Sequence, residues 1–240
     1  MTDLTRLFAA LEATWPPAAT SACGPFTIRD GQGGGKRVSA ATASGPATEA
    51  EIDAAESAME ALGQRPLFQI RPGDAALDAQ LAARGYEVVD PTRLYAAPID
   101  AIAGADKGVK DVKTIHGWGP LAFMLEMWAE GGIGPERVAV MERAASPKTG
   151  FLGRMTNTPG GTAFVSVDGD VAMIHALEVR KTSRRGGMGR VATIDAAIWA
   201  REQGASTFAL ACTEANEAAN ALYSRLGMTD EGGYHYRQKP

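Results

Sequence analysis

The sequence predicts a mixed α/β protein in two parts, and three patterns lead to this expectation. Helical and extended segments alternate along the whole chain of 240 residues. A small, polar stretch at residues 103–108 separates a smaller α/β unit (residues 1–102) from a second unit (residues 110–240). In the second unit two amphipathic helices precede three strands, and the third strand leads through a glycine-rich loop into another helix.

In the first unit, apolar residues between Leu4 and Leu11 recur at helical spacing, and Trp15-Pro16-Pro17 ends that helix. The glycines of residues 31–35 predict the turn of a β-hairpin. The elements expected here are hairpin strands at 26–28 and 37–39, helices over 48–62 and 75–84, a strand over 67–70, and extended segments at 87–89 and 93–95.

In the second unit, Asp168-Gly169-Asp170 predicts a tight turn between two strands. The elements expected are helices over 120–130 and 135–145, strands at 150–154, 162–167 and 171–179, a helix to about 203, a strand over 207–212 and a helix to 226. Residues 77–86 are similar to residues 222–228, since each segment is the apolar end of a helix followed by glycine. Either the two units are related and the first is degenerate, or this common pattern occurs twice by chance.

Composition narrows the class of protein. Hydrophobic residues make up 45% of the chain, enough for a packed core, so the chain is not expected to be disordered. Its net charge is −4, and no basic patch indicates nucleic-acid binding. Two cysteines and three scattered histidines predict neither a disulfide framework nor a metal site. No long apolar run or secretory leader is found, so we expect no membrane partner and a cytoplasmic location.

The loop after the strand at 171–179 is the most informative stretch of the chain. Three glycines remove side chains where a ligand would approach the backbone, namely Gly186, Gly187 and Gly189. The first amide groups of the following helix have no intrahelical partner and carry partial positive charge. Three arginines add full charges beside them, namely Arg184, Arg185 and Arg190. The sequence therefore predicts a site for a pyrophosphate-like anion, the alternative being a glycine-rich connection with solvated arginines.

Two other phosphate-binding motifs, the P-loop and the dinucleotide fingerprint, resemble parts of this sequence. The tract Gly33–Arg37 lacks the Ser or Thr that a P-loop needs for magnesium, so it is better explained by the hairpin turn. Residues 187–192 match the dinucleotide fingerprint, with Glu214 near the position of the ribose-binding acid. The long turn before Gly187 and the short chain after Glu214 weigh against a dinucleotide-binding protein.

Two motifs together resemble the acyl-CoA N-acyltransferase superfamily called GNAT. Arg184-Arg-Gly-Gly-Met-Gly189 is similar to its pyrophosphate motif [QR]-x-x-G-x-[GA]. The run Asn216-Glu-Ala-Ala-Asn-Ala-Leu-Tyr-Ser-Arg-Leu-Gly-Met228 resembles its downstream motif N-x-x-A-x-x-L-Y-x-x-x-G-[FM]. The resemblance covers residues 110–240 and implies a mostly antiparallel sheet with one splayed pair of parallel strands and flanking helices. The first unit has no such loop, so it is either a degenerate GNAT-like half that lacks the cofactor site or an accessory domain.

The resemblance further implies acetyl-CoA as co-substrate and assigns the residues that contact it. The backbones of Leu177 and Val179, with a local bulge, would pair with the pantetheine, and the amides of Arg185, Gly186, Gly187, Met188 and Gly189 would hold the pyrophosphate. Arg184 and Arg190 would lie near the nucleotide phosphates, and Asn216 would hold either the cofactor or the start of its helix. Tyr223 matches the family's general acid, which protonates the departing thiolate.

The general base is less defined, and His175 is the candidate. Residues 174–179 are similar to the corresponding strand of arylalkylamine N-acetyltransferases, where a histidine relays a proton. By alternation, His175 would share a face with Met173, Leu177 and Val179, and a core role is equally open. Members of the family bind the acceptor with the first two helices, which implies as substrate-binding residues Trp118, Phe123, Glu126 and Trp128.

Together these observations predict an N-acetyltransferase that transfers an acetyl group from acetyl-CoA directly to a small-molecule or peptide amine. The competing class is a non-catalytic acyl-CoA-binding module. The first unit would complete the acceptor cleft, add strands to the sheet or mediate formation of a homodimer, and the sequence leaves these three roles open.

Overall fold

A computed structural model describes residues 3–240 of the chain. Its helices are α1 (Leu4–Thr14), α2 (Lys36–Ser39), α3 (Glu49–Ala61), α4 (Ala75–Ala83), α5 (Ile99–Ala103), α6 (Ala122–Glu130), α7 (Pro135–Arg143), α8 (Met188–Glu202) and α9 (Glu217–Arg225). Its strands are β1 (Ala19–Cys23), β2 (Phe26–Asp30), β3 (Thr42–Ala43), β4 (Leu67–Ile70), β5 (Glu87–Pro98), β6 (Val112–Gly117), β7 (Lys148–Met155), β8 (Thr158–Asp168), β9 (Val171–Val179), β10 (Thr207–Thr213) and β11 (Thr229–Gln238).

The centre of the molecule is an eight-stranded sheet with the order β4-β11-β5-β10-β9-β8-β7-β6. All neighbours in it run antiparallel except β9 and β10. This confirms the predicted mixed, mostly antiparallel sheet with a single parallel pair. The doubly wound parallel sheet of a dinucleotide-binding protein is thereby ruled out. A second, three-stranded sheet is formed by β1, β2 and β3.

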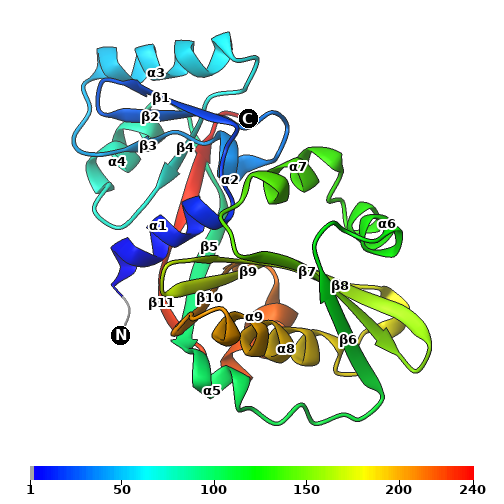
Figure 1. Cartoon of the computed structure of the whole chain (residues 1–240). Helices are drawn as coiled ribbons and strands as arrows, with labels where there is room; N and C mark the ends of the chain where they lie inside the picture. The colour runs from blue at the N-terminus through cyan, green and yellow to red at the C-terminus, as the bar shows by residue number, and fades with distance from the viewer. Residues whose placement is uncertain (1–2) are drawn as a thin grey trace.

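The two predicted units share strands of the large sheet, as Figure 1 shows where β5 and β11 run side by side between the two halves. Residues 92–98 of β5 pair with β10 of the second unit. Residues 235–238 of β11 pair with β4 of the first unit. Strand β5 of the first unit therefore lies beside β10 of the second, and β11 of the second lies beside β4 of the first. One sheet is thus shared by both units.

The elements α3-β4-α4-β5 recur in the same order as α8-β10-α9-β11. The equivalence extends to how the helices end: Tyr86 N–H donates to Leu81 O, and Met228 N–H donates to Tyr223 O. A parallel bridge between Ala41 and Phe68 in the first half corresponds to the parallel β9–β10 pair. Residues 77–86 and 222–228 thus lie at equivalent places in a repeated α-β-α-β order.

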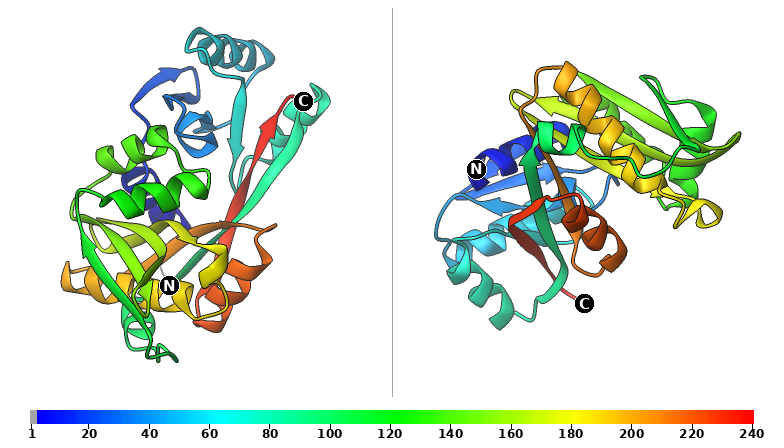
Figure 2. Two further views of the ribbon diagram at one scale, coloured as in Figure 1. Left: turned by 90° about the vertical axis from the view of Figure 1, so that its right-hand side faces the viewer. Right: turned by 90° about the horizontal axis from the view of Figure 1, so that it is seen from below.

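Helices cover both faces of the sheet (Figure 2). Alternate residues of β9 separate the two layers, since Met173 packs with α1 whereas Ile174 packs with α8. Helices α6 and α7 lie on the α1 side, and their buried Trp128 and Met141 join a cluster with Trp15. The edge between the β9 and β10 ends is consequently bordered by helices from both halves.

One expected element is wrong. Lys36–Ser39 is a short helix rather than a hairpin strand, and Phe26–Asp30 pairs instead with Ala19–Cys23 through a turn at Gly24. The physical reason is the glycine run: Gly34 packs against Val38 and Val140 so closely that a Cβ would collide with both. The glycines serve contact between the halves, and not a hairpin. Among residues 3–240 no helix is both long and apolar enough to cross a membrane.

Candidate active site

The parallel strands β9 and β10 separate after a short region of pairing. Only three pairs join them, and the last is Met173 with Ala209. Beyond it β9 continues to Val179 and β10 to Thr213. The backbone of residues 174–179 therefore has one edge bonded to β8 and the other directed into the opening between the strands. An extended ligand can pair with such an edge as an added strand.

A bulge in β9 borders this opening, as the sequence analysis expects. The register with β8 shifts between Phe164–His175 and Thr162–Glu178, and Ala176 has a φ of +49°. The indole Nε1 of Trp128 donates to the Ala176 carbonyl at 2.9 Å. Trp128 therefore supports the bulge from the core and leaves the amide groups of the bulged segment free to face a ligand.

The bulge also changes which side chains share a face, and here the expected alternation is wrong. His175 stays with Met173 on the α1 side, whereas Leu177 and Val179 pack on the α8 side. An extra residue in the strand reverses the parity of every residue after it. As a result Glu178, which alternation placed opposite His175, lies on the side of α6 and α7.

The loop from β9 to α8 ends in backbone that favours glycine. Gly187 precedes α8 with a φ of +85°, and a Cβ there would meet Val109 at 2.9 Å. A Cβ on Gly186 would collide with Met155. The first amides of α8 have no intrahelical acceptors and no side-chain cap, so they carry partial positive charge. The predicted anion site is thus compatible with the local geometry.

The arginines of this loop differ in what they contact. Arg184 Nε donates to the Val179 carbonyl at 3.1 Å and closes the loop. Arg190 Nε donates to the Asp106 carbonyl at 2.8 Å and so connects α8 to residues 103–108 between the two units. Arg185 has a φ of +65° and an exposed side chain, so its guanidinium is available to a phosphate. Met188 contributes a buried side chain that packs against Gly153 and Gly161, which leaves only its backbone for a ligand.

Tyr223 lies on α9 and is buried in the core beside β9 and β10. It packs in the same cluster as Cys212 of β10 and Leu177 of β9. Burial, with smaller contributions from Cys212 and Glu178, raises the pKa of its phenol well above the ordinary value, so Tyr223 carries its proton at neutral pH. Burial also raises the pKa of the Cys212 thiol to about 11, which disfavours a thiolate nucleophile. Asn216 caps α9 by accepting the Ala219 N–H at 3.2 Å.

His175 has both ring nitrogens engaged by the first half of the chain. Its Nε2 lies 2.9 Å from Thr14 Oγ1, whose own hydroxyl donates to Ala10 O at 2.6 Å. Its Nδ1 lies 3.3 Å from Arg37 Nη1, which can only donate. Burial, and secondly the charge of Arg37, lowers the pKa of His175 well below its usual range. These contacts favour a neutral structural histidine over the predicted base.

Glu178 is the titratable residue that the sequence reasoning missed. It is half-buried two residues after the bulge, and its carboxyl packs where a side chain at Gly131 would otherwise lie. No side chain among residues 3–240 forms an ion pair with it. Burial raises its pKa, against the opposing charges of Arg184 and Arg137. The signal in the sequence was the expected bulge, which reverses the alternation and turns Glu178 toward α6 and α7.

The predicted substrate-binding residues separate into two groups. Trp118 and Trp128 are packing residues: Trp118 contacts the Phe164 ring at 5.1 Å, and Trp128 is fully buried. Phe123 is half-exposed, and Glu126 lies 3.8 Å from Arg180 on the surface. The structure therefore does not gather the four side chains on one wall.

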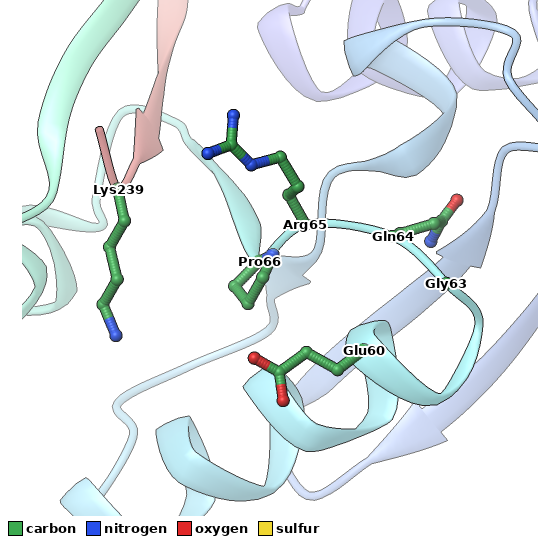
Figure 3. A pocket seen from close by; sticks show the side chains of 6 residues that line it. All are labelled: Glu60, Gly63, Gln64, Arg65, Pro66 and Lys239. Carbon is green, nitrogen blue, oxygen red and sulfur yellow. The ribbon is translucent and has the colours of Figure 1, made fainter.

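Two surface hollows lie away from this opening. One of about 350 Å³ is bordered by the end of α3, the loop into β4 and Lys239 (Figure 3). A groove of about 600 Å³ lies over β5 and β11, between the loops that include Arg71 and Glu214. Neither is lined by a residue of β9 or α8, so neither explains the glycine loop. Within residues 3–240, no group of three or more His, Cys, Asp or Glu side chains is placed to hold a metal ion.

Comparisons with known proteins agree with this geometry. Residues 123–228 match the model of the acetyltransferase (GNAT) family. A GCN5-related N-acetyltransferase from Kribbella flavida is similar over 100% of this chain and 96% of its own, with a TM-score of 0.76 and 21% identity. A functionally unknown conserved protein from Staphylococcus epidermidis covers 97% of this chain and 96% of its own, with a TM-score of 0.72 and 12% identity.

A tandem GNAT protein from the clavulanic acid biosynthesis pathway covers 94% of this chain and 85% of its own, with a TM-score of 0.60 and 14% identity. At these identities the solved structures establish the fold alone. A search of curated proteins found no match.

Proposed function

Residues 123–228 match the model of the acetyltransferase (GNAT) family, and from that match we propose that the chain transfers an acetyl group from acetyl-CoA to a primary amine. The family and the fold support acyl transfer in general. The single observation that carries the finer proposal is the opening between β9 and β10, with the uncapped start of α8 and the protonated Tyr223 beside it.

The residues of this opening fit an acyl-CoA. The free edge of residues 177–179 would pair with the pantetheine amides, and the amides from Arg185 to Gly189 would hold the pyrophosphate. Acetyl-CoA supplies an activated acyl group as its thioester.

The bulge supplies the donor for the developing negative charge. Because Trp128 occupies the Ala176 carbonyl, the peptide is held in one orientation, and an amide of the bulged segment is free to polarise the thioester oxygen. Fixed donors of this kind stabilise the transition state more than the ground state.

Two side chains would move the protons. Attack by the neutral amine forms the C–N bond as the C–S bond breaks, so one proton leaves nitrogen and one is needed at sulfur. Glu178, unpaired on the acceptor side, would take the proton from nitrogen. Tyr223, on the other side of the opening, would donate its hydroxyl proton to the thiolate. Glu178 replaces His175 in this proposal, because His175 has no free lone pair directed at the opening.

Calorimetric titration with acetyl-CoA, with NADH as the control ligand, tests the cofactor. An assay of free thiol with a panel of primary amines then tests turnover. Saturable binding of acetyl-CoA with amine-dependent thiol release supports the proposal. Binding without thiol release for any amine would favour the non-catalytic acyl-CoA-binding module, and binding of NADH in place of acetyl-CoA would overturn both.

A further inference from the structure

A small cavity lies beside α1 in the first half of the chain, outside the opening described above. Its volume is about 10 Å³, which is the lower limit for one water-sized occupant. The residues that line it are Leu11, Glu12, Trp15, Pro17, Arg29, Arg37, Gln69 and Arg71. The side chains of three arginines and one glutamate thus line a space that can hold one water molecule or one small ion.

The one carboxylate is shared between two of the arginines. Glu12 Oε1 accepts from Arg29 Nη2 at 2.8 Å and from Arg71 Nη2 at 2.6 Å. The remaining hydrogen bonds of the two guanidinium groups are made to neutral groups, including Gln69 Oε1, which accepts from Arg71 Nε at 2.7 Å, while the backbone N–H of Arg71 donates to Asp74 Oδ2 at 2.9 Å. Glu12 therefore compensates one positive charge of the pair, and one remains.

Arg37 adds a third positive charge that has no counterion. Its Nε donates to Tyr234 Oη at 3.3 Å and its Nη1 to His175 Nδ1 at 3.3 Å, both long and both to neutral partners. No carboxylate among residues 3–240 forms an ion pair with it. The cavity wall therefore carries a net formal charge of +2 from Arg29, Arg37 and Arg71 against Glu12. Removing unpaired cations from water is strongly unfavourable unless an anion accompanies them.

We propose that this cavity holds a chloride ion. A monoatomic anion is close to water in size, and it would accept hydrogen bonds from the guanidinium groups that line the space. It would also offset charge, which a water molecule would not. Leu11, Trp15 and Pro17 form the apolar part of the lining.

The position of the ion links the two halves of the chain. Arg37 contacts His175 on β9 and Tyr234 on β11. Arg71 lies in the loop after β4, and its partner Glu12 lies on α1. Chloride would therefore stabilise the folded chain as a ligand of the native state alone. This inference is independent of the proposed transferase activity.

Thermal unfolding of the full chain in mixtures of sodium chloride and sodium gluconate at constant ionic strength tests the proposal. The midpoint is expected to rise by roughly 2–5 °C for each tenfold increase in chloride above its dissociation constant. Crystals soaked in bromide should show an anomalous peak in the cavity. Equal midpoints in the two salts and a cavity without an anomalous peak would overturn the proposal.

Gln69→Glu distinguishes the ion from general salt effects and keeps a side chain of the same size at this buried position. The new carboxylate would stand beside Arg71 and supply the missing negative charge from within. We expect this variant to melt higher than the parent in gluconate and to lose its response to chloride. The control Gln203→Glu adds the same charge on the surface and should keep the parent's response. A Gln69→Glu protein that melts lower and still responds to chloride would contradict the assignment.

Discussion

The helices α3 and α8 occupy equivalent places in the two halves, yet their first turns are built in opposite ways. At α3 a capping box closes the turn: Thr48 accepts from the Glu51 N–H, and the Glu51 carboxylate accepts from the Thr48 N–H at 2.8 Å. At α8 the cap is Gly187, which has no side chain to offer. One half thus neutralises its helix start with its own carboxylate, and the other leaves it open to a phosphate.

The equivalent positions on α4 and α9 differ in the same sense. Leu81 and Tyr223 each accept from the residue after the helix-ending glycine, so they correspond in space. The first half has a buried leucine where the second has a buried phenol. A shared fold therefore carries the candidate chemistry in one half only, and the other half contributes strands and helix α1.

The largest expected effect concerns the exchanged strands. Residues 110–240 expressed alone lack β5, which separates β10 from β11 in the sheet. Both strands would expose unpaired edges and the apolar side chains beneath them. We expect this fragment to be insoluble or to lack a cooperative unfolding transition by circular dichroism. Co-expression with residues 1–109 should restore a soluble complex. A fragment that unfolds cooperatively by itself would show that the second half is an independent domain.

Tyr223→Phe tests whether the difference between the halves is chemical. Removing the hydroxyl should lower kcat by about 100-fold or more, with little change in the affinity for acetyl-CoA measured by calorimetry. The matched control is Tyr86→Phe in the first half, which removes a hydroxyl bonded to Glu56 at 2.7 Å. That variant should keep the parent's kcat. Equal loss of kcat in both proteins would mean that the effect is structural.

Arg185→Glu tests the open helix start. Arg185 makes no side-chain hydrogen bond or ion pair within residues 3–240, so its replacement removes no internal contact. A carboxylate beside the first amides of α8 would repel a pyrophosphate, and we expect the dissociation constant for acetyl-CoA to rise about tenfold or more. The control Arg65→Glu makes the same charge change at the first half's loop into β4. If both variants bind acetyl-CoA as the parent does, the loop is not the phosphate site.

The sequence predicts those features of the fold that depend on residues close together in the chain. The capped helix at Thr48, the strand at residues 171–179 and the glycine-rich start of α8 depend on neighbouring residues, and the structure has all three. The exchange of β5 and β11 depends on pairing between residues more than 100 apart, and no local pattern encodes it. The position of Glu178 was missed for a related reason, because one bulged residue at Ala176 reverses the side on which all later residues of the strand lie.

The pH dependence of stability distinguishes Glu178 from His175 as the candidate general base. Burial raises the pKa of Glu178 in the folded chain, so its contribution to stability is greatest below its unfolded pKa and is lost as pH rises through the folded value. Glu178→Gln should therefore melt higher than the parent at pH 7–8, with the difference closing toward about pH 4. The same variant should lose turnover. His175, whose pKa is lowered, has the opposite sign: its contribution is lost on acidification. A Glu178→Gln protein with full turnover would remove Glu178 from the mechanism.

The smallest expected effect concerns the closed helix start, and it completes the contrast with α8. Thr48→Ala removes the side-chain acceptor for the Glu51 N–H, and loss of such a cap reduces the free energy of unfolding by about 1 kcal/mol. Since the first half has no role in holding acetyl-CoA in this proposal, calorimetry should give the parent's affinity. Denaturant titration measures the stability change. A weakened affinity for acetyl-CoA in this variant would imply that the first half of the chain also takes part in binding, and that the start of α8 is not the whole phosphate site.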